Sequence, residues 1–374
     1  MSKYDSIRFY DDAEVNDRLQ TIANHPMFKS LTHFTFPDKS EEDLKKMLAS
    51  IHSIQEFHEK VISKTMERVL ETSSEGLTIS GFEKLKPNTS YLFISNHRDI
   101  LLDTCLLNVS LLNENLTMTA SAVGNNLVQK PFLMDLAKLN RNFIVQRDVS
   151  PRELLMSSKL MSAYIGHLIK EKNRSVWIAQ REGRTKDGND ATHSGVLKMM
   201  AMASDQPDTI EYLKSLRIVP VSISYEYDPT DKLKMPQIIA QLSDIEYIKD
   251  KNEDFINLMS GVVGQKKRIH IHVGNILNDE LEAIKNATCN STKQIQALTK
   301  VIDRQIIENY RLWPTNYIAF DLLNQTDQYA AMYNDQEKQL FLRRLEMRVD
   351  KNNPVVVQKF LEMYANPVVN KNNL

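Results

Sequence analysis

The sequence has few cysteines and few glycines for its length. Its 374 residues include only two cysteines, Cys105 and Cys289, which is too few for a disulfide framework and suggests a reducing compartment. The 10 glycines and 12 prolines argue against an all-β sandwich, which needs many tight turns. A chain of this length can bury a substantial core, so we expect a globular protein of one large or two ordinary domains.

Long apolar runs are also missing. No stretch approaches the ~18–20 consecutive apolar residues that a membrane-spanning helix needs. The chain begins with the letters MSKYD and continues into a polar stretch, and we expect no signal peptide. The sequence therefore predicts a cytoplasmic protein that is soluble or peripheral to the cytoplasmic membrane.

The chain as a whole lacks a surplus of either charge. Its formal net charge is −1, which gives no reason to expect nucleic acid as a partner. Residues 121–190, however, contain twelve lysines and arginines against seven aspartates and glutamates. This local surplus suits an anionic ligand or an anionic membrane surface, although a solvated face would have the same composition.

Hydrophobic periodicity changes twice along the chain. Residues 1–35 show no regular pattern, and apolar residues at helical spacing then run from a helix start at Ser40 to about Leu70. From about residue 77, short apolar runs alternate with amphipathic stretches. The predicted strands are 77–80, 91–95, 117–123, 142–145, 175–179, 216–224 and 268–273, and the predicted helices are 99–113, 128–139, 151–172, 192–203 and 278–288.

This alternation is typical of an α/β fold, in which helices flank a central sheet. Beyond about residue 290 the pattern is helical again, and the final letters NPVVNKNNL suggest a frayed end. We therefore expect an N-terminal helical region over residues 1–75, an α/β domain over 76–280 and a C-terminal helical extension over 281–374.

The stretch SNHRDILLD places His97 between an apolar run and a predicted helix. Sheets of this kind bind ligands outside the carboxyl ends of their strands, where His97 and Glu182 would fall. An imidazole accepts a proton at one nitrogen best when a carboxylate holds the other, and Asp99 and Asp103 are both candidates for that carboxylate. The alternative is a turn in which His97 has no chemical role and Asp99 only caps the helix.

Two later stretches carry groups suited to an anionic ligand. In REGRTKDG, Gly183 lets the backbone approach a ligand, and Arg184 and Lys186 offer donors to a phosphate. In RNFIVQRD, Arg147 ends a strand, where it could bind a phosphate or pair with Asp148 or Glu153. The alternative for REGRTKDG is a polar hairpin loop with scattered charge.

Two further strands contain unusual residues. Pro220, within LRIVPVSISYEYDP, is uncommon inside a central strand and indicates an edge, a bulge or a place where a ligand passes. His270 and His272 share one strand face, but no cysteine or acidic ligand stands at a suitable spacing beside them. We therefore expect no metal site.

In their order, these stretches resemble the sequence blocks of the glycerolipid acyltransferases, the membrane-associated family that includes glycerol-3-phosphate and 1-acylglycerol-3-phosphate (lysophosphatidate) acyltransferases. The blocks read here Asn96-His97 followed by Asp103, then FIVQR ending at Arg147, EGRT over 182–185, and VPV over 219–221. AVGNNLVQKPFL and THSGVLKM resemble two further segments of the family. The resemblance covers about residues 77–275, and it implies the mixed central sheet of the glycerol-phosphate acyltransferases.

The resemblance implies that His97 is the general base for transfer of an acyl group from a thioester to a hydroxyl, and that an aspartate holds its imidazole. The acyl donor would be a coenzyme A or acyl carrier protein thioester, with no other cofactor. The acceptor would be glycerol 3-phosphate in the first place and lysophosphatidate in the second. The residues implied to bind substrate are Arg147, Glu182, Gly183 and Arg184 at the acceptor's phosphate, and Pro220 near the acyl chain.

The chain departs from the family pattern at the histidine block. The family keeps four residues between its histidine and its aspartate, whereas five separate His97 from Asp103. An extra residue inside the helix would displace Asp103 by about 100° around the axis. An extra residue in the preceding turn would leave Asp103 in place with Asp99 as the helix cap, and we favour this arrangement.

Other functions stay open. The chain could acylate another hydroxylated lipid, or it could be a catalytically silent relative that binds lipid or acyl carrier protein. A hydrolase would need a Gly-x-Ser-x-Gly elbow, which is not evident. Direct transfer from a thioester needs no separate nucleophile, so we expect Cys105 to be a buried helix residue. Membrane contact is expected through the basic segment together with apolar positions on the 128–139 helix or the terminal helices.

Overall fold

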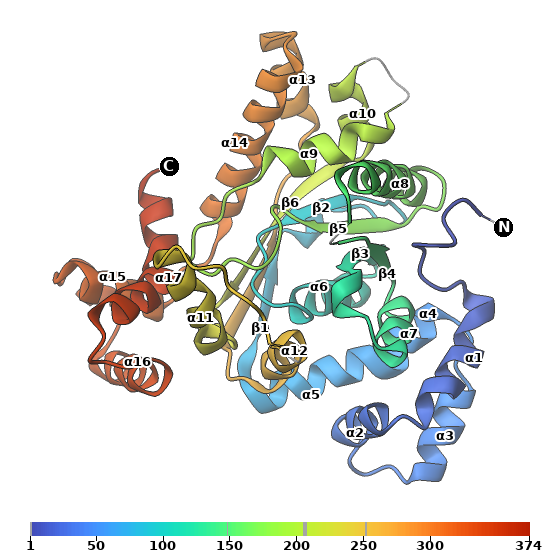
Figure 1. The fold of residues 1–374 in the computed structure, drawn as a ribbon, viewed down its shortest axis with the longest axis horizontal. Coiled ribbons are helices and arrows are strands. Elements are labelled where there is room, and N and C mark those ends of the chain that lie inside the picture. Colours follow the sequence, from blue (N-terminus) through green and yellow to red (C-terminus); the bar gives the residue numbers. More distant parts are fainter. Residues whose placement is uncertain (1, 148, 205–207, 251–252) are drawn as a thin grey trace.

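A seven-stranded mixed sheet lies at the centre of the protein, with helices on both faces (Figure 1). The structure is a computed structural model and describes residues 2–147, 149–204, 208–250 and 253–374. The strands are β1 (Ser74–Ser80), β2 (Leu92–Ser95), β3 (Thr119–Gly124), β4 (Asn142–Val145), β5 (Ser175–Ala179), β6 (Ile218–Tyr225) and β7 (Lys267–Val273). The α/β class and the mixed sheet expected from the sequence are confirmed. The predicted boundaries near residues 75 and 280 stay predictions.

The strand order is β1-β7-β6-β2-β5-β3-β4. Strands β6, β2, β5, β3 and β4 are parallel to one another. Strand β7 is antiparallel to β6, and β1 is parallel to β7. The carboxyl ends of five strands therefore meet at one edge of the sheet, which is where open α/β sheets bind their ligands.

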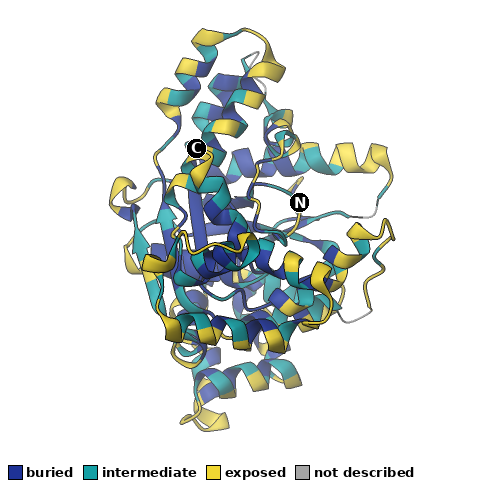
Figure 2. Cartoon of the chain, turned by 90° about the vertical axis from the view of Figure 1, so that its left-hand side faces the viewer, coloured by how far each residue is buried: buried dark blue, intermediate teal, exposed yellow. Residues whose placement is uncertain are grey.

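The two faces of the sheet are both apolar. Leu92 and Ile94 of β2 belong to one buried layer, and Phe93 between them belongs to the other. This two-sided burial explains why the strand is a continuous apolar run. The helices over the face of Leu92 are α8 (Pro151–Lys170), α9 (Ser194–Met200), α10 (Thr209–Ser215), α13 (Asn278–Ala287) and α14 (Ser291–Asn309). Figure 2 shows buried residues at the sheet and exposed residues on the outer helices.

The N-terminal helices and the two helices that follow β2 and β3 pack over the other face. They are α1 (Asp12–Ala23), α2 (Pro26–Thr35), α3 (Glu41–Ala49), α4 (Ile54–Phe57), α5 (Ser63–Ser73), α6 (Leu102–Asn113) and α7 (Pro131–Leu139). The expectation that residues 1–35 are irregular is wrong, because α1 buries Val15, Leu19 and Ile22 at helical spacing. The continuous helix expected from Ser40 is also wrong, since it stops after α3 and restarts at a cap in which Ser53 accepts from the Glu56 N–H.

The C-terminal helices form a third apolar cluster. They are α15 (Pro314–Asn324), α16 (Asp335–Arg348) and α17 (Pro354–Asn372), and they pack on α11 (Asp231–Leu242). The expected frayed end is wrong, because α17 continues through Pro367 and Val368 is buried. Asn366 Nδ2 donates to the Asp187 carbonyl at 2.7 Å, so contacts with a distant loop hold this helix end.

The connection between β6 and β7 carries two helices that the sequence patterns did not predict. These are α11 and α12 (Glu253–Val263), and both lie beside the carboxyl edge of the parallel strands (Figure 1). The interior Pro236 of α11 obscured its pattern, since proline normally interrupts a helix.

Candidate active site

The turn between β2 and α6 lies at the carboxyl edge of the sheet. β2 ends at Ser95 and α6 begins at Leu102, so residues 96–101 form the turn. Asn96 fixes its start, because its Nδ2 donates to the Ile223 carbonyl at 2.9 Å and its Oδ1 accepts from the Ile223 N–H at 2.8 Å. Both the nitrogen and the oxygen of the Asn96 side-chain amide therefore bond to the backbone of β6, directly before His97.

Asp103 holds the imidazole of His97. Nδ1 of His97 lies 2.8 Å from Asp103 Oδ2. The same oxygen accepts from the backbone N–H groups of Arg98 at 2.7 Å and Asp99 at 3.1 Å, and Oδ1 accepts from the Tyr225 hydroxyl at 2.8 Å. Asp103 is fully buried, whereas 15% of the His97 side chain is exposed. A carboxylate held in this way keeps the proton on Nδ1 and leaves Nε2 for a reactant.

Asp99 has a different task. Its Oδ1 accepts from the backbone N–H groups of Leu101 at 3.0 Å and Leu102 at 2.9 Å, so it caps the first turn of α6. Burial, and then the nearby Asp103, raise the pKa of this carboxyl. Asp103, and not Asp99, therefore faces His97, and Asp99 holds the turn before α6.

Trp177 packs against the other side of the imidazole. Its ring and that of His97 meet edge to face, with centroids 5.3 Å apart and an angle of 70° between the planes. The Trp177 indole N–H donates to Ser95 Oγ at 2.8 Å, which fixes the ring at the end of β2. The sequence patterns did not identify this residue, although it stands in the apolar run directly before REGRTKDG.

The loop after β5 lies against the His97 turn. The Thr185 N–H donates to the His97 carbonyl at 2.8 Å, and the Thr185 hydroxyl donates to Asp190 Oδ1 at 2.9 Å. Asp190 also forms a buried ion pair with Arg98. Thr185, which stands where the family usually has serine, thus links the loop to the histidine block.

Arg147 and Glu182 form an ion pair at the carboxyl ends of β4 and β5. The Arg147 N–H donates to Asn125 Oδ1 at 2.9 Å, so the GNNL segment after β3 positions its backbone. Gly183 has φ of +72°, a conformation that favours glycine, and no protein atom lies within 4 Å of the place where a Cβ would be. Of the two acids expected to pair with Arg147, Asp148 lies outside the described residues, and Glu153 accepts from the Ser150 N–H at 2.9 Å.

Arg184 points towards the β6–β7 connection, where its Nη1 donates to Thr230 Oγ1 at 3.1 Å. Lys186 on the same loop is half-buried, and burial followed by nearby cations lowers its pKa to about 8. The charged groups that lower it are Arg184, Lys234, Arg181 and Lys249. Lys186 therefore lies among several cations close to the histidine block.

Pro220 lies inside the sheet and away from these charged groups. β6 is placed between β2 and β7, so an edge position is excluded. The Pro220 carbonyl accepts from the Gly274 N–H at 2.8 Å, one residue beyond the last β6–β7 pair of Val221 with Val273. Because the N–H and C=O of a strand residue point the same way, the missing N–H of Pro220 faces the end of β7 and removes no bond to β2.

The remaining candidates have structural partners. His270 Nδ1 lies 2.8 Å from Thr78 Oγ1, and Ser80 Oγ lies 2.7 Å from His272 Nδ1. Within the described ranges, no three His, Cys, Asp or Glu side chains gather as metal ligands would. Cys105 is buried in α6 and its thiol pKa is raised by burial.

The sequence patterns missed Tyr225, Asp190 and Thr230 as neighbours of the site. Tyr225 and Thr230 stand in SYEYDPT, at and just after the end of a predicted buried strand, which was the available signal. Asp190 carried no signal, because a single acid in a polar loop is common. Tyr225 and Thr230 bond to the predicted residues Asp103 and Arg184, which are distant in the sequence.

Residues 76–224 match the protein-family model described as Acyltransferase. The match covers 149 of the 374 residues and shows that this segment is similar to the acyltransferases. It contains every predicted site residue from His97 to Pro220, and the resemblance to the glycerolipid acyltransferases is confirmed at the level of the family.

Among solved structures, the chain is similar to the 1-acyl-sn-glycerophosphate (LPA) acyltransferase PlsC from Thermotoga maritima. The two share 11% sequence identity over 78% of this chain and 93% of that chain, with a TM-score of 0.39. Comparison with curated proteins returned no match.

Replacing Asp103 with Asn should lower kcat for acyl transfer by roughly 10²- to 10⁴-fold, because the imidazole loses the carboxylate that fixes its tautomer. Asp99→Asn is the matched control, since asparagine still caps a helix, and it should retain most of the activity. Both variants are assayed with a palmitoyl thioester after their melting temperatures are compared. Equal losses of kcat in the two variants would contradict the assignment of Asp103.

Proposed function

We propose that this protein transfers a fatty acyl group from an acyl thioester to a hydroxyl of a glycerol-phosphate acceptor in glycerolipid synthesis, with His97 as general base. The observation that carries the proposal is the 2.8 Å bond between His97 Nδ1 and Asp103 Oδ2. It leaves Nε2 of a partly exposed imidazole at the carboxyl edge of the sheet, beside the loop that carries Arg184 and Lys186.

The proposed reaction needs one base and no covalent enzyme intermediate. His97 Nε2 takes the proton from the acceptor hydroxyl as its oxygen attacks the thioester carbonyl. The tetrahedral intermediate collapses with cleavage of the carbon–sulfur bond, and the departing thiolate takes the proton from Nε2. The imidazolium that forms between these steps is stabilised by the buried Asp103 carboxylate.

Two cations of the loop after β5 support a phosphate-bearing acceptor. Arg184 and Lys186 lie on the loop that contacts the His97 carbonyl through Thr185, and Arg147 stands at the neighbouring strand end. Glycerol 3-phosphate is the first choice of acceptor and lysophosphatidate the second. The acyl donor is a thioester of coenzyme A or acyl carrier protein. A catalytically silent relative would have no carboxylate within reach of His97, and the bond to Asp103 argues against it.

The direct test offers the purified protein a palmitoyl thioester with glycerol 3-phosphate or lysophosphatidate. The ester product should form with the wild type and not with His97→Ala. His167→Ala is the control, because His167 pairs with Glu171 on the surface of α8 and should be dispensable. An active His97→Ala enzyme would refute the mechanism.

The half-buried Lys186 predicts a pH dependence. Its pKa of about 8 means that, in the enzyme without a bound acceptor, the Lys186 side chain is a charged ammonium group below pH 8. It loses this charge as the pH rises through 8. If it binds the phosphate, kcat/KM for glycerol 3-phosphate should fall between pH 7 and pH 9, relative to Lys186→Arg, which stays charged. Parallel profiles of the two enzymes would show that Lys186 does not contact the acceptor.

We also propose that the β6–β7 connection contacts a membrane. Seven large apolar side chains are exposed within residues 239–263, namely Ile239, Leu242, Ile245, Ile248, Ile256, Met259 and Val263. The apolar side chains of α7 are buried or half-buried, so the surface expected on residues 128–139 is not formed there. None of the helices within the described ranges is long and apolar enough to cross a bilayer.

Helix α12 has its apolar face outside and its small or polar face inside. Ile256, Met259 and Val263 are exposed, whereas Asn257 and Gly261 are buried. Gly261 lies directly against the Asp99 carboxylate, which a Cβ at this position would strike. The outer face of α12 is therefore one helix away from the His97 turn, where a lipidic reactant has to arrive.

The chemistry of this surface favours lipid over a protein partner. Residues 239–263 contain five acidic residues and two lysines, so an acidic carrier protein would be repelled. Its exposed large apolar side chains are aliphatic or thioether groups. Of the Trp, Tyr and Arg anchors typical of protein interfaces, the segment contains only the half-buried Tyr247. Burial of the apolar face in the interfacial region of a membrane is the remaining driving force.

Flotation with phosphatidylcholine vesicles tests this surface. The variant carrying Ile256→Glu and Met259→Glu should lose most of the vesicle binding of the wild type, because two charges would enter the interface. Leu340→Glu with Met347→Glu on α16 is the matched control, since these side chains are also exposed. Equal binding by both variants, or no binding by the wild type, would contradict the proposal.

A further inference from the structure

The residues that follow β6 form a buried polar cluster for which the proposed reaction gives no role. Asp228, Thr230, Asp231 and Lys234 are all buried. Burial of charged groups is unfavourable unless each one is paired and hydrogen-bonded. The partners of this cluster therefore show what it holds together.

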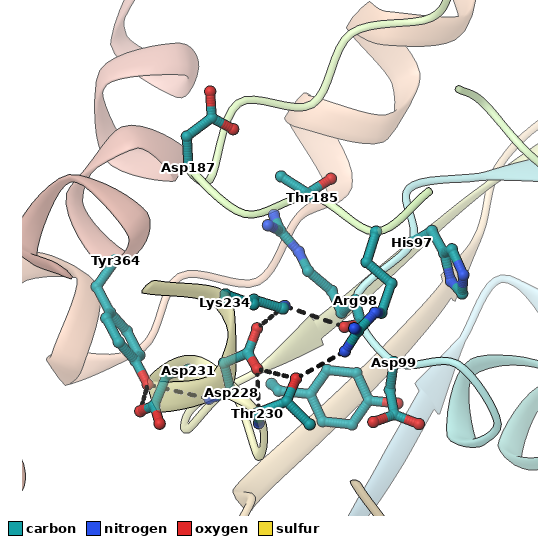
Figure 3. Close-up of polar contacts among 12 residues, drawn as sticks. His97, Arg98, Asp99, Thr185, Asp187, Asp228, Thr230, Asp231, Lys234 and Tyr364 are labelled. Carbon is teal, nitrogen blue, oxygen red and sulfur yellow. Dashed lines mark hydrogen bonds and ion pairs between the residues drawn. The ribbon is translucent and has the colours of Figure 1, made fainter. Parts of the chain in front are cut away.

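On its inner side the cluster contacts both the turn that carries His97 and the loop that carries Arg184 (Figure 3). Lys234 Nζ pairs with Asp228 and donates to the carbonyl of Arg98, the residue after His97, at 3.1 Å. Asp228 Oδ1 accepts from the Thr230 N–H at 2.9 Å and from the Thr230 hydroxyl at 3.1 Å. The single proton of this hydroxyl is thereby directed to Asp228, and its oxygen is left to accept the bond from Arg184.

On its outer side the cluster is bound to the C-terminal helices. Arg344 of α16 donates to Asp231 Oδ2 at 2.7 Å and to the Asp228 carbonyl at 2.8 Å. The Tyr364 hydroxyl of α17 donates to Asp231 Oδ2 at 2.8 Å and accepts from the Asp228 N–H at 3.1 Å. Both the backbone N–H and the C=O of Asp228 are therefore fixed by the C-terminal helices.

The same helices reach the Arg184 loop from a second direction. Asn366 Nδ2 donates to the Asp187 carbonyl at 2.7 Å, and Asn370 Nδ2 lies 3.4 Å from the Gly188 carbonyl. Arg184 is thus placed between two contacts that end on α17. None of the C-terminal residues that make these contacts belongs to residues 76–224, which match the acyltransferase family model.

We propose that the C-terminal helices complete the acceptor site by fixing Arg184 through Asp228 and Thr230. This inference rests on the proposed role of Arg184 in binding the acceptor's phosphate. A free arginine side chain loses considerable rotamer entropy when it binds a ligand, and the bond to Thr230 removes part of that loss before the acceptor arrives. The guanidinium has five N–H donors and gives one to Thr230, so the others stay available for phosphate oxygens. Thr230 is a positioning residue.

Thr230→Val removes the acceptor oxygen and keeps the shape of the side chain, whereas Thr230→Ser keeps the oxygen. Thr230→Val should raise KM for glycerol 3-phosphate about fivefold, the loss expected for one hydrogen bond, with kcat and KM for the acyl donor within twofold of the wild type. Thr230→Ser should restore the wild-type KM. Tyr364→Phe, which detaches α17 from Asp228 and Asp231, should raise KM for the acceptor in the same direction.

A parallel Arg184→Ala enzyme separates the possible failures. If Arg184→Ala leaves KM for the acceptor unchanged, the proposed acceptor site is wrong. If Arg184→Ala raises this KM but Thr230→Val or Tyr364→Phe does not, the acceptor site stands and the inference about the C-terminal helices is wrong. In the Arg184→Ala background, Thr230→Val should have no further effect, and an additional rise in KM would show that Thr230 acts by another route.

Discussion

The candidate site depends on one carboxylate that is fully buried at the start of α6. Asp103 accepts bonds from the imidazole of His97, from two backbone N–H groups and from the hydroxyl of Tyr225. Burial, and then Asp103, raise the Tyr225 pKa well above its usual value, so this hydroxyl keeps its proton and donates it. Four donors offset the cost of burying the charge, and together they join the turn after β2, α6 and β6 at one point.

The loop after β5 shares this arrangement through backbone contacts. Thr185 bonds to the His97 carbonyl, and Asp190 links Thr185 to Arg98. Buried groups therefore position His97 and the loop of Arg184 relative to each other. Arg147 and Glu182, by contrast, form an exposed ion pair. Exposed ion pairs contribute little to stability, so the second pair can open for a ligand at small cost. The rigid part of the site is thus the surroundings of His97, and the adaptable part is the Arg147–Glu182 pair.

The sequence could predict those parts of the site whose partners are close in the chain or follow the strand periodicity. Strands β4 and β5 begin and end at the predicted residues because both are short apolar runs bounded by polar residues. His97 and Asp103 are six residues apart, and only the start of α6 decided between Asp103 and Asp99. By contrast, the bonds from Arg344 and Tyr364 to Asp231 span more than a hundred residues, and no local pattern indicates them.

The same distinction explains which segments were mispredicted. The end of α17 carries NPVVNKNNL, whose asparagines and proline favour fraying when they are considered alone. In the folded chain two of those asparagines satisfy the carbonyls of Asp187 and Gly188, so the residues that weaken the helix locally are the ones that attach it to the active-site loop. Propensity was overridden by tertiary hydrogen bonds, and these bonds connect the end of α17 to the loop of Arg184. A deviation from local preference at this helix end therefore has a physical reason in the site that it supports.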